Sequence, residues 1–170
     1  MRPLGLAAGL ALVAMAQVTV APLFPVGTAN FEFVLVSLAM VMAFSGPRTL
    51  MGAMPFAAIC LAFASNRSPA LLILAYLPML PLAGWLAESG PPMNRFLQVL
   101  SATMVTGAVS RSVLAAGAVS GGAELAVGPL ITGILLPGLL LDMALLTVAY
   151  GPVRLLGWEP GEMTLQPGRY

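Results

Sequence analysis

Long apolar stretches separated by short polar turns fill most of this sequence. They predict six helical segments, bounded at about 4–24, 31–45, 49–64, 70–87, 96–119 and 126–150. About twenty apolar residues at a rise of 1.5 Å per residue cross a hydrocarbon core of roughly 30 Å. We therefore expect an all-α membrane protein. Residues 1–151 should form a compact bundle of six transmembrane helices, and residues 152–170 a cytoplasmic tail.

Three of these segments carry signals of irregular helices. Segments 31–45 and 49–64 are short for a span and are joined by a Gly-Pro-Arg turn at 46–48, which predicts a helical hairpin. The fourth segment contains Pro78 and Pro81, and two prolines three residues apart should break or kink the helix.

The fifth segment is rich in small residues, which predicts a place inside the bundle.

The first segment has a second possible interpretation, a removable export signal, because VTVA near its end resembles a cleavage site. The apolar stretch is long for such a signal, and Pro22 follows the small residue. These features favour a first membrane span.

The composition supports an integral membrane protein and limits its chemistry. Hydrophobic residues make up 59% of the chain and charged residues 8%, whereas about 25% are charged in soluble proteins. All seven basic residues are arginines and form no clustered basic face, so nucleic acid is not an expected partner. Histidine and lysine are missing, and Cys60 is the single cysteine. We therefore expect no enzyme, no cofactor and no metal site.

The arginines also predict the orientation of the bundle. With six spans and a cytoplasmic N-terminus, the cytoplasmic side receives Arg2, Arg48, Arg95, Arg154 and Arg169. Arg67 is then the lone arginine outside. This bias agrees with the positive-inside rule, so both chain ends are predicted to be cytoplasmic.

Two charged residues, Arg111 and Asp142, lie within predicted spans, where a charge is costly unless it is paired. Counting residues from the span ends puts Arg111 in the outer third of the membrane and Asp142 in the inner third. Their depths would then differ by more than about 10 Å, so we expect no direct contact between them. Glu32 and Glu124, at the outer starts of the second and sixth spans, are better-placed partners for Arg111.

Asp142 would instead be met by Arg48, by Arg95 or by polar backbone near a kink. Structural ion pairing is the simplest interpretation of the intramembrane charges. A ligand, ion or proton pathway and a docking site for a partner's membrane helix are the alternatives. The candidate structural or partner-binding residues are Arg111, Asp142, Glu32, Glu124, Asn30 and Gln17.

The stretch QVTVAPLFPVGTANFEFVLVSLAMVMAFSGPRTLMGAMPF, residues 17–56, has a distinctive order. A first span ends in Gln and Pro, a turn leads to Asn30 before the second span, and a basic turn leads to a glycine-containing third span. Together with the six-span pattern and the short chain, this order resembles the MreD family of rod shape-determining proteins, which are small bacterial inner-membrane proteins. The second span of that family usually opens with Pro-Asp-Leu or Pro-Asn, of which Asn30 alone carries over. The closing PVRLLGWEPGE is similar to the ends of some members.

The resemblance implies a non-enzymatic component of the cell-wall elongation machinery in the bacterial cytoplasmic membrane, which docks partner membrane helices. The implied partners are an MreC-like bitopic protein, a RodA-like glycosyltransferase, a penicillin-binding transpeptidase and MreB-like filaments. The family's fold is similar to the substrate-binding subunits of energy-coupling-factor transporters, so uptake of a vitamin-type small molecule is the alternative. A polar pocket that opens outward near Arg111 would favour uptake, and an apolar groove without enclosed volume would favour docking.

Overall fold

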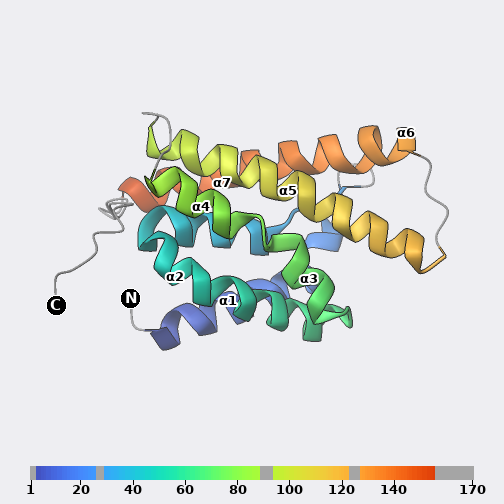
Figure 1. Cartoon of the computed structure of the whole chain (residues 1–170), viewed down its shortest axis with the longest axis horizontal. Coiled ribbons are helices and arrows are strands. Elements are labelled where there is room, and N and C mark those ends of the chain that lie inside the picture. Colours follow the sequence, from blue (N-terminus) through green and yellow to red (C-terminus); the bar gives the residue numbers. More distant parts are fainter. Residues whose placement is uncertain (1–2, 26–28, 89–93, 123–126, 156–170) are drawn as a thin grey trace.

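The computed structural model describes residues 3–25, 29–88, 94–122 and 127–155, which form a bundle of helices (Figure 1). In chain order the elements are α1 (Pro3–Thr19), the 3-10 turn η1 (Ala21–Leu23), α2 (Phe33–Ser65), α3 (Pro69–Tyr76), α4 (Met79–Glu88), α5 (Arg95–Ser120), α6 (Val127–Pro129), the π-helical turn η2 (Leu130–Leu135) and α7 (Leu136–Leu155). Within these ranges, five helical stretches are long and apolar enough to cross a membrane. They are Leu4–Leu23, Phe33–Ser65, Pro69–Glu88, Arg95–Ser120 and Leu130–Leu155. This architecture fits a helical membrane protein.

Helix α2 folds back on itself at Gly46. This glycine has φ 81° and ψ 173°. The conformation lies outside the helical region, and glycine adopts it far more readily than other residues. A straight helix of 33 residues would be about 50 Å long. Yet Glu32, just before α2, and Arg67, just after it, line the same cavity. The helix therefore consists of two antiparallel arms, 33–45 and 47–65, as the Gly-Pro-Arg turn predicts, and Figure 1 shows the chain reversing there.

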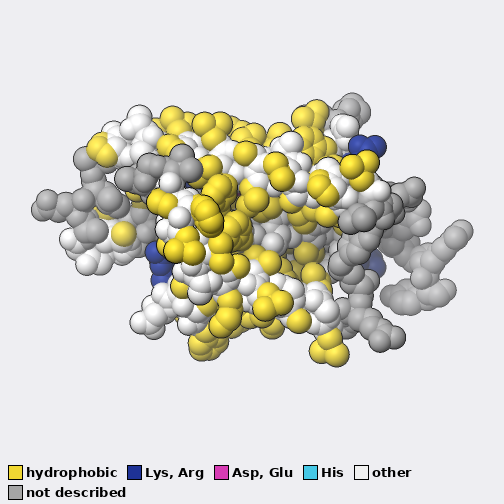
Figure 2. All heavy atoms as spheres, turned by 180° about the vertical axis from the view of Figure 1, so that it is seen from behind, with side chains coloured by type: hydrophobic (Ala, Val, Ile, Leu, Met, Phe, Trp, Pro, Cys, Tyr) yellow, Lys and Arg dark blue, Asp and Glu magenta, His cyan; other side chains and the backbone are white. Residues whose placement is uncertain are grey.

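The core lies along α2. Within Phe33–Ser65, 61% of the most apolar 18-residue stretch is buried, and the same measure for α5 is 39%. The prediction that the small-residue segment occupies the interior therefore holds for only one face of α5, while α2 is the central element. The outer helices are much less buried. The corresponding values are 17% for Leu4–Leu23 and 22% for Leu130–Leu155. Figure 2 shows apolar side chains over the middle of the molecule and basic side chains toward its two ends.

The predicted break in the fourth segment is present. Helix α3 ends at Tyr76 and α4 begins at Met79, so the chain is interrupted at Leu77 and Pro78. Proline has no N–H to donate to the preceding turn, and the ring of Pro81 would clash with the carbonyl of Leu77 in a continuous helix.

The last helix is longer than the sequence pattern indicated. Residues 152–155, assigned to the tail, continue α7 as far as Leu155. Arg154 lies in the last turn, where a positive charge interacts favourably with the helix dipole. The remainder of the predicted tail lies outside the described residues.

Candidate functional site

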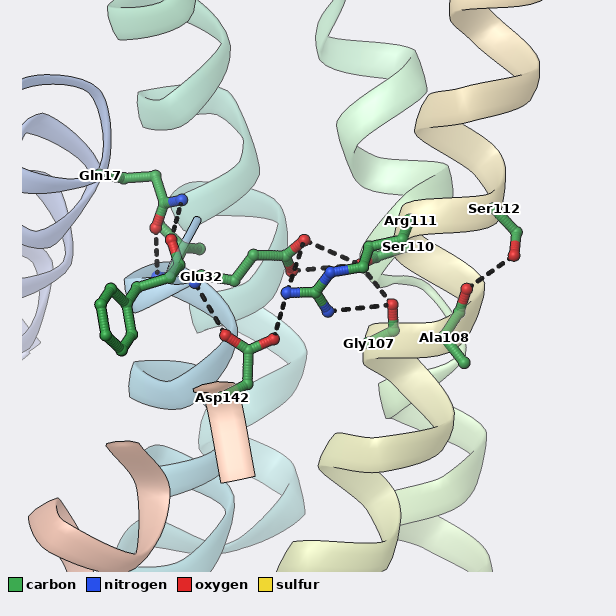
Figure 3. Close-up of polar contacts among 10 residues, drawn as sticks. Gln17, Glu32, Gly107, Ala108, Ser110, Arg111, Ser112 and Asp142 are labelled. Atoms are coloured by element: carbon green, nitrogen blue, oxygen red, sulfur yellow. Dashed lines mark hydrogen bonds and ion pairs between the residues drawn. The ribbon is translucent and has the colours of Figure 1, made fainter. Parts of the chain in front are cut away.

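One face of α5 supplies the polar side chains of the interior. Its buried residues recur every three or four positions, as expected for a helix with one face toward the core. They are Val99, Ala102, Thr103, Thr106, Gly107, Ser110 and Arg111. Two polar residues of this face contact other elements (Figure 3). Ser110 contacts Glu32 at the start of α2, and Arg111 contacts Asp142 in the middle of α7.

Arg111 and Asp142 form a buried ion pair. The Nη2 of Arg111 donates to Oδ2 of Asp142 at 2.6 Å, and the two residues are 7% and 1% exposed. The second carboxylate oxygen of Asp142 accepts from the backbone N–H of Glu32 at 2.9 Å. The expectation that depth separates Arg111 from Asp142 is therefore wrong, and so is the expectation that Arg48 or Arg95 is the partner of Asp142. Polar backbone is a partner of Asp142, but it lies at the start of α2 and not near a kink.

The relative placement of α5 and the last helical stretch explains why counting residues gave the wrong depths for Arg111 and Asp142. That count treated the fifth and sixth spans as upright and level at their outer ends, whereas α5 and the α6 end of the last segment diverge there (Figure 1). The long side chain of Arg111 also extends across the surface of α7. It does so over Gly138, where an added Cβ would lie 2.7 Å from Cζ of Arg111. Gly138 precedes Asp142 by four residues and so shares its helix face, which leaves room for the guanidinium group beside the carboxylate.

Glu32 is the second carboxylate of the cluster, as predicted from its place at the start of the second span. Its Oε1 lies 3.8 Å from Nη2 of Arg111, and its Oε2 accepts from the hydroxyl of Ser110 at 3.1 Å. The residue is 8% exposed. Because the contact with Arg111 is longer than that of Asp142, Glu32 is the less completely neutralised acid.

Gln17 fixes the entry into α2 from the side of α1. Its Nε2 donates to the carbonyl of Phe31 at 2.7 Å, and its Oε1 accepts from the N–H of Val34 at 3.3 Å. The amide therefore satisfies the N–H of Val34, one of the groups that the start of a helix leaves without partners, and also holds the chain just before α2. Gln17 thus links α1 to the segment that carries Glu32 (Figure 3).

The remaining candidates have different surroundings. Asn30 is exposed and lines the cavity described below. Glu124 lies outside the described residues. Arg95 is far from the cluster, and its Nη2 donates to the carbonyls of Met42 and Ala43 at 2.9 and 3.2 Å, near the fold-back of α2.

A cavity of about 570 Å³ opens beside the ion cluster. Its polar lining residues are Gln17, Asn30, Glu32, Ser65, Arg67, Tyr76 and Arg111, and its apolar lining includes Val18, Leu61, Leu72, Leu114, Leu130 and Ile134. The volume lies within the range of roughly 300–1,000 Å³ that is typical of small-molecule sites. Within the described part of the chain, no group of three or more Cys, Asp or Glu side chains could hold a metal ion.

Three residues of this region were missed by the sequence reasoning. Ser110 and Tyr76 sit in apolar segments without any local motif, so the sequence carried no signal for their roles. Gly138 could have been found from its spacing of four residues to Asp142. Comparison with known proteins adds nothing to this assignment: no family model matches the chain, and no curated protein or solved structure matches it.

Proposed function

We propose that this protein is a non-enzymatic component of the bacterial cytoplasmic membrane that docks the membrane helices of partner proteins in the cell-wall elongation machinery. The observation that carries the proposal is the outer face of α1. Gly5 and Gly9 are exposed, lie four residues apart on one face, and have no atom within 4 Å of the place where a Cβ would be. Small residues at this spacing let two membrane helices approach closely.

The contrast with glycines inside the bundle supports this interpretation. At Gly107, an added Cβ would meet Leu139 at 2.9 Å and Leu35 at 3.1 Å, so that glycine already serves a helix contact within the chain. The Gly5 and Gly9 face has no such neighbour among the described residues, in keeping with its place on the least buried of the five apolar stretches. A second membrane helix is the partner that a small-residue face of this kind fits, and it would come from a bitopic MreC-like protein.

The proposed topology is six membrane crossings with both chain ends in the cytoplasm. The fold-back at Gly46 divides the stretch Phe33–Ser65 into two crossings, which raises the five apolar stretches to six. The start of α1 and the end of α7 lie at the same end of the bundle, opposite the cavity (Figure 1). Arg48 and Arg154 would then face the cytoplasm and Arg67 the outside, in agreement with the positive-inside rule.

Co-purification with the MreC-like protein encoded in the same organism tests the docking proposal. We expect Gly9→Ile to reduce recovery of the partner strongly, because the β-branched side chain would hold the helices apart. Gly52→Ile is the matched control, since Gly52 is also an exposed helical glycine with nothing within 4 Å of an added Cβ. Equal recovery by the two variants, with wild-type yield of both, would refute the α1 face. Failure of the wild-type chain to retain the partner would refute docking to an MreC-like protein.

By the criterion set from the sequence, a polar pocket near Arg111, the cavity favours the second candidate function, membrane capture of a small molecule for uptake, whereas the docking proposal depends on the α1 face. Polar and apolar residues both line the cavity, Arg111 among them, and it would open outward in the proposed topology. Retention of a vitamin-type compound by the purified chain would favour this role. The further partners implied by the resemblance, RodA-like, MreB-like and penicillin-binding proteins, belong to the docking proposal.

A further inference from the structure

The cavity contains two charges that the protein does not neutralise closely. Arg111 is committed to Asp142 at 2.6 Å, which leaves Glu32 with its longer contact of 3.8 Å. Arg67, in the turn after α2, is exposed and forms no ion pair with a described carboxylate. Both residues line the cavity. Apart from Arg111, which is paired with Asp142, the cavity therefore presents one acidic and one basic side chain to whatever occupies it.

A third polar group in the cavity is available for a ligand. Tyr76 is 1% exposed and lines the cavity, yet its hydroxyl has no hydrogen-bond partner among the described residues. The hydroxyl group of a largely buried tyrosine usually finds a hydrogen-bond partner, and here a molecule in the cavity can supply one. The phenol lines the same cavity as Glu32 and Arg67. Its hydroxyl is therefore available to a molecule that occupies the cavity.

The rest of the wall is apolar and selects the body of the ligand. Leu61, Leu72, Leu114 and Ile134 come from three different helical stretches and from η2, and together they face the same space. An occupant gains binding free energy when it buries apolar surface against them. Apolar walls with a few placed polar groups are the usual design of a small-molecule site.

We propose that the cavity binds a small zwitterionic molecule with an apolar body, of the amino-acid or short-peptide class, whose ammonium group meets Glu32 and whose carboxylate meets Arg67. Tyr76 bonds a polar group between the two ends. In the cell, this inference rests on the second candidate function, uptake of a small molecule. Binding of the zwitterion to the cavity does not depend on the docking of a partner helix.

Isothermal titration of the full chain in lipid nanodiscs with leucyl-leucine tests the proposal. Its two blocked forms, acetyl-leucyl-leucine and leucyl-leucinamide, each lack one charge. Saturable binding of the free dipeptide is expected, with affinity at least about tenfold weaker for each blocked form, because each loses one charge-assisted contact. Absence of saturable binding by the dipeptide, or equal binding of all three compounds, would overturn the proposal.

Variants assign the contacts. Arg67→Gln and Glu32→Gln should each weaken the affinity for leucyl-leucine about tenfold or more, and Arg48→Gln, which alters an exposed arginine outside the cavity, should leave it unchanged. Tyr76→Phe should weaken binding several-fold, whereas a purely structural role predicts no change, because the hydroxyl has no hydrogen-bond partner among the described residues. Unchanged affinity in both Arg67→Gln and Tyr76→Phe would overturn the assignment. Docking of an MreC-like partner would be unaffected by either outcome, so the two proposals fail separately.

Discussion

Removal of the Arg111 side chain is the perturbation with the largest predicted effect on stability. At an effective dielectric constant of 20, charges separated by the observed 2.6 Å attract by about 6 kcal/mol, and charges separated by 3.8 Å by about 4 kcal/mol. Desolvation offsets much of this attraction, but loss of one partner from a buried pair typically costs about 3–5 kcal/mol. Arg111→Met should therefore lower the free energy of unfolding by about 3–5 kcal/mol, because Asp142 and Glu32 then remain together without their cation.

Asp142→Asn should cost less, about 1–3 kcal/mol. The amide oxygen can still accept from the backbone N–H of Glu32, and Glu32 remains as a counter-ion for Arg111. The double variant Arg111→Met/Asp142→Asn should be more stable than the sum of the single losses indicates, by roughly 1–3 kcal/mol, since it removes both members of the closest pair.

Reversible unfolding of the purified chain in mixed detergent micelles measures these differences. Arg154→Met is the control, since this exposed arginine should contribute less than about 0.5 kcal/mol. A loss below about 1 kcal/mol for Arg111→Met, or strictly additive losses in the double variant, would refute the argument that the ion cluster holds α2, α5 and α7 together.

Three further substitutions test single features of the fold. Gly138→Ala should cost about 1–3 kcal/mol of unfolding free energy because the new Cβ displaces the Arg111 guanidinium, whereas Gly151→Ala on the same helix, with nothing within 4 Å, should be neutral or stabilising. Gly46→Ala should cost about 1–3 kcal/mol because its φ of 81° and ψ of 173° lie in a region essentially restricted to glycine, and Gly52→Ala in the same helix should not. Arg95→Met should cost about 1.5–3 kcal/mol by removing charged donors from two carbonyls before the fold-back. Thermal or detergent unfolding of each variant against wild type checks all three. Equal stabilities within either glycine pair, or wild-type stability of Arg95→Met, would contradict the stated cause.

Features set by local chemistry could be predicted from the sequence. Apolar length gave the helical stretches, the Gly-Pro-Arg turn gave the fold-back at Gly46, and Pro78 gave the break between α3 and α4. The pairing of Glu32 with Arg111 followed from their predicted depths. Apart from that pairing, for which the counted depths also offered Glu124, each of these signals depends on the residue itself or on a few neighbours in the chain.

Features set by the relative placement of helices could not be predicted. Residue counting gives a position along one helix axis, but it contains neither the tilt of that helix nor its offset from the next. The contact between Arg111 and Asp142 depends on both, and also on the bare backbone at Gly138. The unpaired hydroxyl of Tyr76 depends on the shape of a cavity to which several helices contribute. Information of this kind resides in the packing and not in any one segment.

The central claim is that α2 crosses the membrane twice, so that the cavity faces outward and both chain ends face the cytoplasm. Labelling of single cysteines with a membrane-impermeant maleimide, in a Cys60→Ser background, tests it directly. Arg67→Cys should be labelled in intact spheroplasts, whereas Arg48→Cys and Arg154→Cys should be labelled only after the membrane is permeabilised. Labelling of Arg48→Cys and Arg154→Cys from opposite sides, or of Arg67→Cys from the same side as both, would contradict the account.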